Sequence, residues 1–235
     1  MTTAYDTSPY DNTSAYDTPV VLDRREGPYG EVVLRRHGEL LQIIANGCFL
    51  MDTSDGRSER LLVDAARDAL DSRPEPHVLI GGLGVGFSLA HAAADPRWGR
   101  ITVVEREPAI VEWHRSGPLS ALSAAALADP RTEIVKTDLV AFVNETCATF
   151  DALCLDIDNG PEPLVRASNA TLYGREGLDL LRNALTDEGR VLLWSGFESA
   201  SFEATAREAG FSVTRRLVAN GPRPELDHHI YVLSA

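Results

Sequence analysis

Short apolar segments alternate with amphipathic ones from residue 74 to the end of the chain. The apolar segments have the length of buried strands and predict strands over residues 77–81, 101–105, 132–136, 151–155 and 190–194. The segments between them predict helices over residues 87–94, 108–115, 121–128, 174–185 and 198–209, with a short helix from residue 139. This alternation is typical of a doubly wound α/β fold with a mainly parallel sheet.

Two further strands, over residues 211–219 and 229–233, are predicted at the end of the chain with only a loop between them. A connection without a helix implies an antiparallel pair. A dinucleotide-binding Rossmann domain ends with a parallel strand instead. The pattern therefore predicts a Rossmann-like sheet of the class I methyltransferase type, parallel apart from an antiparallel C-terminal strand.

A different pattern precedes this domain. Residues 31–34 and 40–44 read as strands, and Asn46-Gly47 is a strong hairpin-turn signal. Ser58 is expected to cap a helix whose apolar face carries Leu62, Ala65, Ala66 and Ala69. We expect a disordered tail over residues 1–19, which are rich in Ser, Thr, Asp and Pro, then an N-terminal β-hairpin unit and helix over residues 20–73, then a catalytic domain over residues 74–235.

The charge balance bears on the kind of partner. The formal net charge is −13, so the phosphates of a nucleic acid would be repelled, whereas a cationic substrate such as an amine would be attracted. An acidic surface that only favours solubility explains the same number.

Composition restricts the setting further. Hydrophobic residues make up 44% of the chain, and no apolar run reaches the roughly 20 residues of a membrane span. Met1–Pro19 lacks the basic and apolar parts of a secretory signal. The three cysteines are scattered without metal-ligand spacing. We therefore expect a cytoplasmic protein with no bound metal and no membrane partner.

The first candidate site is the turn after the first strand of the large domain, which reads Gly81-Gly82-Leu83-Gly84-Val85-Gly86. Glycines at 82, 84 and 86 let a ligand approach the backbone, and the next helix presents free N–H groups. Glycines also serve close strand-to-helix packing. Their spacing favours a turn of the S-adenosylmethionine type over one that binds a dinucleotide.

Two carboxylates follow at the ends of the next strands. Glu105 is placed to accept hydrogen bonds from both hydroxyls of a ribose, although a strand-end carboxylate can also be a solvated loop charge. Asp138 is placed to accept from the exocyclic amine of an adenine, and it also has the position of a helix N-cap.

The loop after the fourth strand reads Asp156-Ile157-Asp158-Asn159-Gly160-Pro161. Loops at the carboxyl ends of parallel strands line the ligand crevice. Asp156, Asp158 and Asn159 can hold an ammonium group or take its proton before attack on a sulfonium-activated carbon. The same residues would also form an ordinary capped turn.

Over roughly residues 26–195 the order of these motifs is similar to the spermidine synthase family. The shared elements are Pro28-Tyr29-Gly30 before a strand, Asn46-Gly47, the glycine turn, Val103-Val104-Glu105, the acidic loop from Asp156, and Leu172-Tyr173. The resemblance implies a small N-terminal β-unit, a donor that is S-adenosylmethionine or its decarboxylated form, and transfer of an aminopropyl group to an amine. It also implies that Asp156 is the catalytic acid that accepts the amine proton.

The chain departs from that family at several positions. Gly84 stands where the family usually has an Asp near the donor's amine, and Leu50 stands in place of a Gln. The family's Asp-Glu pair and Tyr fall near Asp55, Gly56 and Glu59, so Glu59 is a candidate for contact with the acceptor. The resemblance covers the superfamily pattern but not every residue of the reaction.

Five aromatic or imidazole positions remain. Trp194 ends the fifth strand at the rim of the crevice and is a candidate for contact with the acceptor. Trp113 and His114 either flank an adenine or pack in the core, and the His228-His229 pair is expected to be structural.

The sequence thus predicts an S-adenosylmethionine-dependent transferase acting on a small amine, with transfer of a methyl group as the main hypothesis. Because of Gly84, aminopropyl transfer is the alternative, and a non-catalytic binding module on the same fold is the third interpretation. A homodimer is a further expectation from the resemblance.

Overall fold

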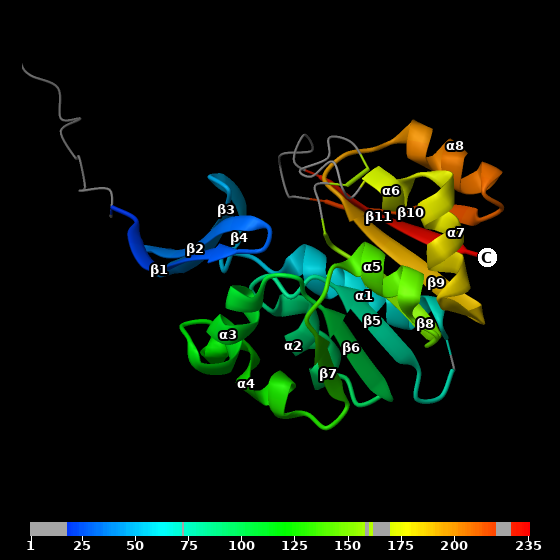
Figure 1. Cartoon of the computed structure of the whole chain (residues 1–235). Coiled ribbons are helices and arrows are strands. Elements are labelled where there is room, and N and C mark those ends of the chain that lie inside the picture. Colours follow the sequence, from blue (N-terminus) through cyan, green and yellow to red (C-terminus); the bar gives the residue numbers. More distant parts are fainter. Residues whose placement is uncertain (1–17, 72, 158–159, 162–169, 220–226) are drawn as a thin grey trace, which may run out of the picture.

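A small antiparallel sheet stands beside a larger mixed one in the computed structural model, which describes residues 18–71, 73–157, 160–161, 170–219 and 227–235 (Figure 1). The small sheet has the order β1-β2-β3-β4, with the bounds β1 Val20–Gly27, β2 Gly30–His37, β3 Leu40–Ala45 and β4 Cys48–Asp52. Asn46 has a positive φ of 50° and Gly47 one of 78° at the β3–β4 turn, as the Asn-Gly signal predicts. The sequence pattern does not predict β1 and β4. The tail expected over residues 1–19 lies almost wholly outside the described residues.

The larger sheet has seven strands in the order β10-β11-β9-β8-β5-β6-β7. Their bounds are β5 His77–Gly81, β6 Arg100–Val104, β7 Thr132–Val135, β8 Phe150–Leu155, β9 Leu185–Ser195, β10 Ser212–Val218 and β11 His228–Ser234. β5 to β9 pair in parallel, whereas β11 lies antiparallel between β9 and β10. This confirms the predicted Rossmann-like class I methyltransferase sheet.

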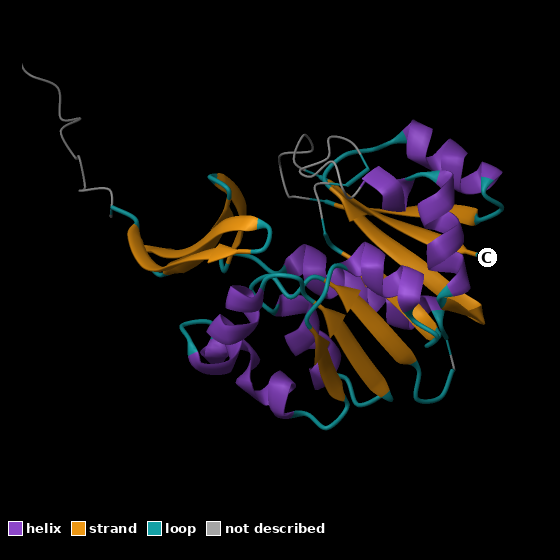
Figure 2. Cartoon of the chain, viewed as in Figure 1, coloured by secondary structure: helices purple, strands orange, loops and turns teal. Residues whose placement is uncertain are grey.

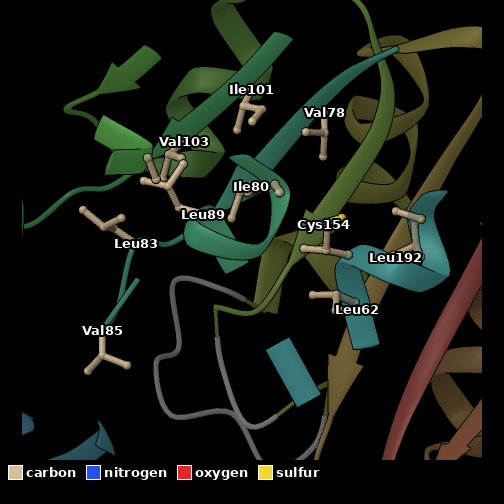
Figure 3. Close-up of a cluster of buried hydrophobic side chains, with 14 of the residues drawn as sticks. Leu62, Val78, Ile80, Leu83, Val85, Leu89, Ile101, Val103, Cys154 and Leu192 are labelled. Carbon is tan, nitrogen blue, oxygen red and sulfur yellow. The ribbon is translucent and has the colours of Figure 1, made fainter. Parts of the chain in front are cut away.

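Helices flank the larger sheet on both sides (Figure 2). Their bounds are α1 Arg57–Ala69, α2 Phe87–Ala94, α3 Pro108–Ser116, α4 Ser120–Ala128, α5 Leu139–Glu145, α6 Ala170–Tyr173, α7 Arg175–Asn183 and α8 Ala200–Glu208. Successive strand residues point to opposite faces, so two apolar cores form. Val78 and Ile80 of β5 lie in one core with Leu62 of α1 and Leu89 of α2, as Figure 3 shows, whereas Leu79 lies in the other.

Helix α1 differs from its prediction at its first residue and extends the larger core. Its N-cap is Gly56 and not Ser58, which lies inside the helix. A Cβ at Gly56 would lie 2.3 Å from Cγ of Phe87, so the close approach of α1 to α2 requires glycine there. The helix contacts β8, β9 and β11 of the larger sheet. The domain boundary at residue 73 stays a prediction.

The small sheet docks on α3 of the larger unit. The indole Nε1 of Trp113 donates to Oδ2 of Asp23 at 2.8 Å, and a guanidinium nitrogen of Arg25 lies 3.3 Å from Glu112. Trp113 is otherwise buried in the core. This contact sets β4 over the edge of the larger sheet where its parallel strands end.

Asp151 lies near the amino end of β8 and links neighbouring segments at that end of the parallel strands. Its carboxylate accepts from the backbone N–H of His77 at 2.7 Å and from the hydroxyl of Thr186 at 2.9 Å, and it pairs with Nε of Arg73 at 2.7 Å. We expect Asp151→Ala to lower the free energy of unfolding by about 1–3 kcal/mol, because the N–H of His77 and the hydroxyl of Thr186 lose their acceptor, while Arg73 keeps its longer ion pair with Glu188. Urea denaturation measures the change.

Asp187→Ala is the matched control, since Asp187 is exposed on the neighbouring β9. It should change stability by no more than about 0.5 kcal/mol. Equal urea midpoints for the two variants would contradict the role given to Asp151.

Candidate functional site

A cavity of about 560 Å³ lies between β4, the segment that leads into α1, and the carboxyl ends of the parallel strands. It runs along the sheet edge from the end of β7 to the start of β11. Seven of the residues predicted for the site line it, namely Glu59, Gly82, Gly84, Glu105, Asp138, Asp156 and Trp194. Asp158 and Asn159 lie outside the described residues, and their roles stay predictions.

The glycine turn has the backbone conformation that only glycine adopts easily. Gly82, Gly84 and Gly86 have φ values of 92°, 51° and 96°. A Cβ at Gly82 would lie 3.2 Å from the carbonyl oxygen of Asp156, so the turn also needs glycine for close packing against the β8 loop. Gly86 does not line the cavity; a Cβ there would lie 2.8 Å from Cε1 of His114.

The buried side chain of His114 supports this turn through a hydrogen bond to its backbone. Its Nε2 lies 2.8 Å from the carbonyl oxygen of Gly84, and its Nδ1 lies 2.7 Å from the hydroxyl of Ser123. Burial lowers the pKa of His114, so the ring is neutral at pH 7. Nε2 therefore carries the proton for the carbonyl, and Nδ1 accepts from Ser123. From the sequence, His114 either flanks an adenine or packs in the core. In the structure its side chain is fully buried in the core.

Glu105 is fixed by two backbone amides. Oε2 accepts from the N–H of Leu83 at 2.9 Å, and Oε1 accepts from the N–H of Glu107 at 2.7 Å. Burial raises the pKa of Glu105, and these hydrogen bonds oppose that rise. The N–H of Gly84 acts on the same carboxylate and opposes the rise as well, and a carboxylate can accept about four hydrogen bonds in all. The position suits the predicted ribose contact, and that contact stays a prediction.

Asp138 caps helix α5 and lines the cavity at the same time. Its Oδ1 accepts from the N–H of Val140 at 2.9 Å and of Ala141 at 3.3 Å. Its Oδ2 lies 3.7 Å from a guanidinium nitrogen of Arg106. The capping interpretation is thus confirmed, whereas contact with an adenine is untested.

Asp156 and Glu59 form an electrostatically coupled pair in the cavity wall. Burial raises the pKa of Asp156 to about 7, and the negative charge of Glu59 adds to the rise. Glu59 is itself buried and accepts a hydrogen bond from the hydroxyl of Ser58 at 2.9 Å. A carboxyl group with a pKa near 7 suits proton transfer at neutral pH.

The sequence pattern does not point to Met51 as part of the site. Its side chain lies beside Gly84, the glycine that stands where the family usually has an Asp. A Cβ at Gly84 would lie 2.3 Å from the sulfur of Met51. The same sulfur accepts from the N–H of Val85 at 3.3 Å. Met51 therefore occupies the space that a side chain at residue 84 would need. A lone Met in an apolar strand carries no sequence signal for such a contact.

Trp194 and His228 form the wall at the far end of the cavity. Their rings meet edge to face, with centroids 4.9 Å apart. The indole Nε1 of Trp194 is buried and has no hydrogen-bond partner within the described part of the chain. In the same part of the chain, no three His, Cys, Asp or Glu side chains are grouped to hold a metal ion.

The cavity is strongly acidic. Seven carboxylates line it, from Asp52, Asp55, Glu59, Glu105, Glu107, Asp138 and Asp156. Arg106 is the one arginine among the lining residues, and no lysine lines the cavity within the described chain. A cavity with this charge balance favours cationic ligands.

Comparison with known proteins shows which family this chain is similar to. The family described as the spermine/spermidine synthase domain matches residues 68–205. Two curated relatives from Streptomyces coelicolor are named polyamine aminopropyltransferase 1 and 2. The first is 36% identical over 53% of this chain and 23% of its own length, and the second is 32% identical over 83% of this chain and 36% of its own length. The chain thus spans about a quarter to a third of the length of these relatives.

Solved structures show the same fold. A spermidine synthase in complex with the transition state analogue AdoDATO has a TM-score of 0.73 and 18% identity, covering 92% of this chain and 73% of its own. The spermidine synthase from Thermotoga maritima has a TM-score of 0.70 and 18% identity, covering 92% and 72%.

The main hypothesis of methyl transfer is therefore wrong. It rested on Gly84, and the family match and the aminopropyltransferase relatives favour the alternative instead. In the structure the space beside Gly84 is taken by the side chain of Met51, so the missing Asp does not leave an open gap there. No described helix is long and apolar enough to cross a membrane.

The contact of Met51 with Gly84 can be tested by a double-mutant cycle. We expect Gly84→Ala to cost about 1–3 kcal/mol of folding free energy, because the new methyl group meets the sulfur and the backbone is left-handed. Met51→Ala makes room, so the double variant should lose less than the sum of the single losses. Urea denaturation of the four proteins measures the coupling.

Gly47→Ala is the control, because Gly47 has a positive φ but nothing lies within 4 Å of the position that its Cβ would take. Its cost should add independently to that of Met51→Ala. Additive costs for Gly84→Ala as well would mean that Met51 does not exclude a side chain there.

Proposed function

Because the chain belongs to the spermine/spermidine synthase family, we propose that it transfers an aminopropyl group from decarboxylated S-adenosylmethionine to the amino group of a small amine. The observation that carries this proposal is the coupled pair Asp156 and Glu59 in an acidic cavity beside the glycine turn. The relatives' activity supports the reaction type, and the cavity supports cationic substrates.

The donor is assigned to the half of the cavity at β5, β6 and β7. The left-handed glycines leave the turn backbone open to a ligand, and Glu105 offers two oxygens that are already oriented by backbone amides. Asp138 lies at the next strand end. These groups fit a nucleoside with its ribose on Glu105 and its adenine toward Asp138. Bound here, the donor supplies a carbon activated by a positively charged sulfur.

The acceptor amine is assigned to the half of the cavity at β8, β9 and β11. Asp156 and Glu59 together attract its ammonium group, and Asp156 takes one proton from it. The neutral nitrogen then forms a C–N bond to the activated methylene carbon as the C–S bond breaks. The electron pair of that bond goes to sulfur, and 5′-methylthioadenosine leaves. The new secondary amine keeps a positive charge, which the acidic cavity still stabilises.

The raised pKa of Asp156 supports this division of labour. An ordinary Asp would be too weak a base to accept a proton from an ammonium group, whereas burial and the charge of Glu59 make Asp156 a stronger one. The remaining contribution is alignment of the nitrogen with the carbon, which the rigid strand ends provide.

The setting and assembly of the protein stay proposals. Cys48, Cys147 and Cys154 are free thiols, which is in keeping with the expected reducing cytoplasm. A homodimer remains an expectation from the family.

The reaction is tested by incubating the protein with decarboxylated S-adenosylmethionine and a panel of amines, and measuring 5′-methylthioadenosine. We expect product with the decarboxylated donor, and Asp156→Asn should lower kcat by about 10²–10⁴-fold, the usual range for loss of a general base. Binding of 5′-methylthioadenosine to the variant should stay close to that of the unmodified protein, because Asp156 is not assigned to the donor.

Two outcomes would contradict the proposal. Affinity for the donor without turnover on any amine would favour the non-catalytic binding module. A variant that loses nucleoside binding together with turnover would show that Asp156 is a donor ligand and not the base.

The pH dependence of kcat/KM tests the coupling between the two carboxylates. Asp156 must be ionised to accept a proton, so the rate should fall as the pH drops below about 7. Glu59→Gln removes a negative charge and should lower the pKa of Asp156, which moves this acidic limb to lower pH. Asp68→Asn is the control, because Asp68 lies on the same helix but is exposed and pairs with Arg216. Superimposable profiles for Glu59→Gln and the unmodified protein would refute the coupling.

A further inference from the structure

One contact between the two sheets reaches directly into the cavity. The guanidinium carbon of Arg106 lies 4.2 Å from the centroid of the Tyr29 ring. Tyr29 lies in the β1–β2 turn, and Arg106 follows Glu105 at the end of β6. A separation this short is well within the range of a cation–π contact.

Tyr29 is itself held in place by the small sheet. Its carbonyl oxygen accepts from Nδ2 of Asn46 at 3.1 Å, and Oδ1 of the same Asn46 accepts from the N–H of Glu31 at 2.9 Å. The Asn-Gly turn and the β1–β2 turn are thereby tied together. The ring of Tyr29 is thus presented by a fixed turn.

Arg106 lies between the carboxylates assigned to the donor. Its side chain is 18% exposed and lines the cavity. The nearest carboxylate oxygens, of Glu107 and Asp138, are each 3.7 Å away, too long for a hydrogen-bonded fork. The ring of Tyr29 is thus a further contact that holds the guanidinium beside its two long ion pairs.

The charge of Arg106 also matters to its neighbours. Burial raises the pKa of Glu105 and of Glu107, and the guanidinium opposes the rise at both. Arg106 thus helps to keep Glu105 ionised where a ribose would need an acceptor.

We propose that Arg106 is a donor-binding residue whose planar guanidinium packs against the adenine, and that Tyr29 positions it. The inference rests on the proposed function and extends it, because it makes the N-terminal sheet part of the donor site. A guanidinium has two flat faces and is weakly hydrated, so it can stack on a ring at each face. The ring of Tyr29 contacts the guanidinium, and the side chain of Arg106 also lines the cavity next to Asp138.

The test is calorimetric titration with 5′-methylthioadenosine. We expect Tyr29→Leu to weaken binding by about five- to tenfold, because the loss of a partly desolvated cation–π contact is of that size. Tyr29→Phe keeps the ring and should stay within about twofold of the unmodified protein. Arg106→Leu should weaken binding at least as much as Tyr29→Leu. In turnover assays KM for the amine should be unchanged in all three.

Arg24→Leu is the matched control, because Arg24 lies on the same sheet, pairs with Glu31 and does not line the cavity. It should bind as the unmodified protein does. Thermal unfolding of each variant shows whether the small sheet stays folded, and Tyr29→Phe tests the ring contact even if Tyr29→Leu unfolds.

The outcomes separate this inference from the proposed function. If the unmodified protein does not bind the nucleoside, the donor site itself is wrong and the inference falls with it. If the unmodified protein binds and Arg106→Leu binds equally well, the function stands and the role of Arg106 is refuted. A tenfold loss in Tyr29→Phe would refute the ring contact, since the ring remains.

Discussion

The contact of β4 with the glycine turn is the constraint on which the site depends. The sulfur of Met51 accepts from the N–H of Val85 and lies against Gly84, so β4 forms one wall of the cavity at the strand ends. In the same cavity, burial raises the pKa of Asp156 and gives its charge a longer reach than it would have in water.

Burial also explains why the residues that support the glycine turn are neutral or already hydrogen-bonded. His114 holds the carbonyl of Gly84 as an uncharged ring, since burial lowers its pKa. Glu105 accepts backbone N–H groups at both of its carboxylate oxygens and so holds the turn. The groups that support the turn are thus satisfied within the fold, whereas Asp156 and Glu59 add to each other's negative charge in the cavity wall.

The fold was predictable because its signals are local and periodic. The helix over residues 87–94 agrees residue for residue with α2, and the antiparallel ending agrees with β10 and β11. β1 was not predictable in this way, because most of its residues are exposed and its apolar residues are followed by a run of charged ones with no alternation. The prediction of Ser58 as the N-cap of α1 was wrong, since Gly56 has that position. Phe87 of α2 packs closely on Gly56, and this contact between distant parts of the chain has no local sequence signal.

The site was predictable where chemistry follows strand ends, and not where it depends on contacts across the chain. Glu105, Asp138 and Asp156 all follow strands and all line the cavity. Met51 and Arg106 line the cavity, and Tyr29 contacts Arg106 from the small sheet. No spacing in the sequence reveals these contacts between the two sheets. Gly84 taken alone suggested a changed reaction, because the Asp that the family usually has is absent there. The space beside Gly84 is filled by Met51 of β4, which the sequence pattern does not show. A glycine in a ligand-binding turn has to be interpreted together with whatever fills its empty space, and here that is a methionine from another sheet.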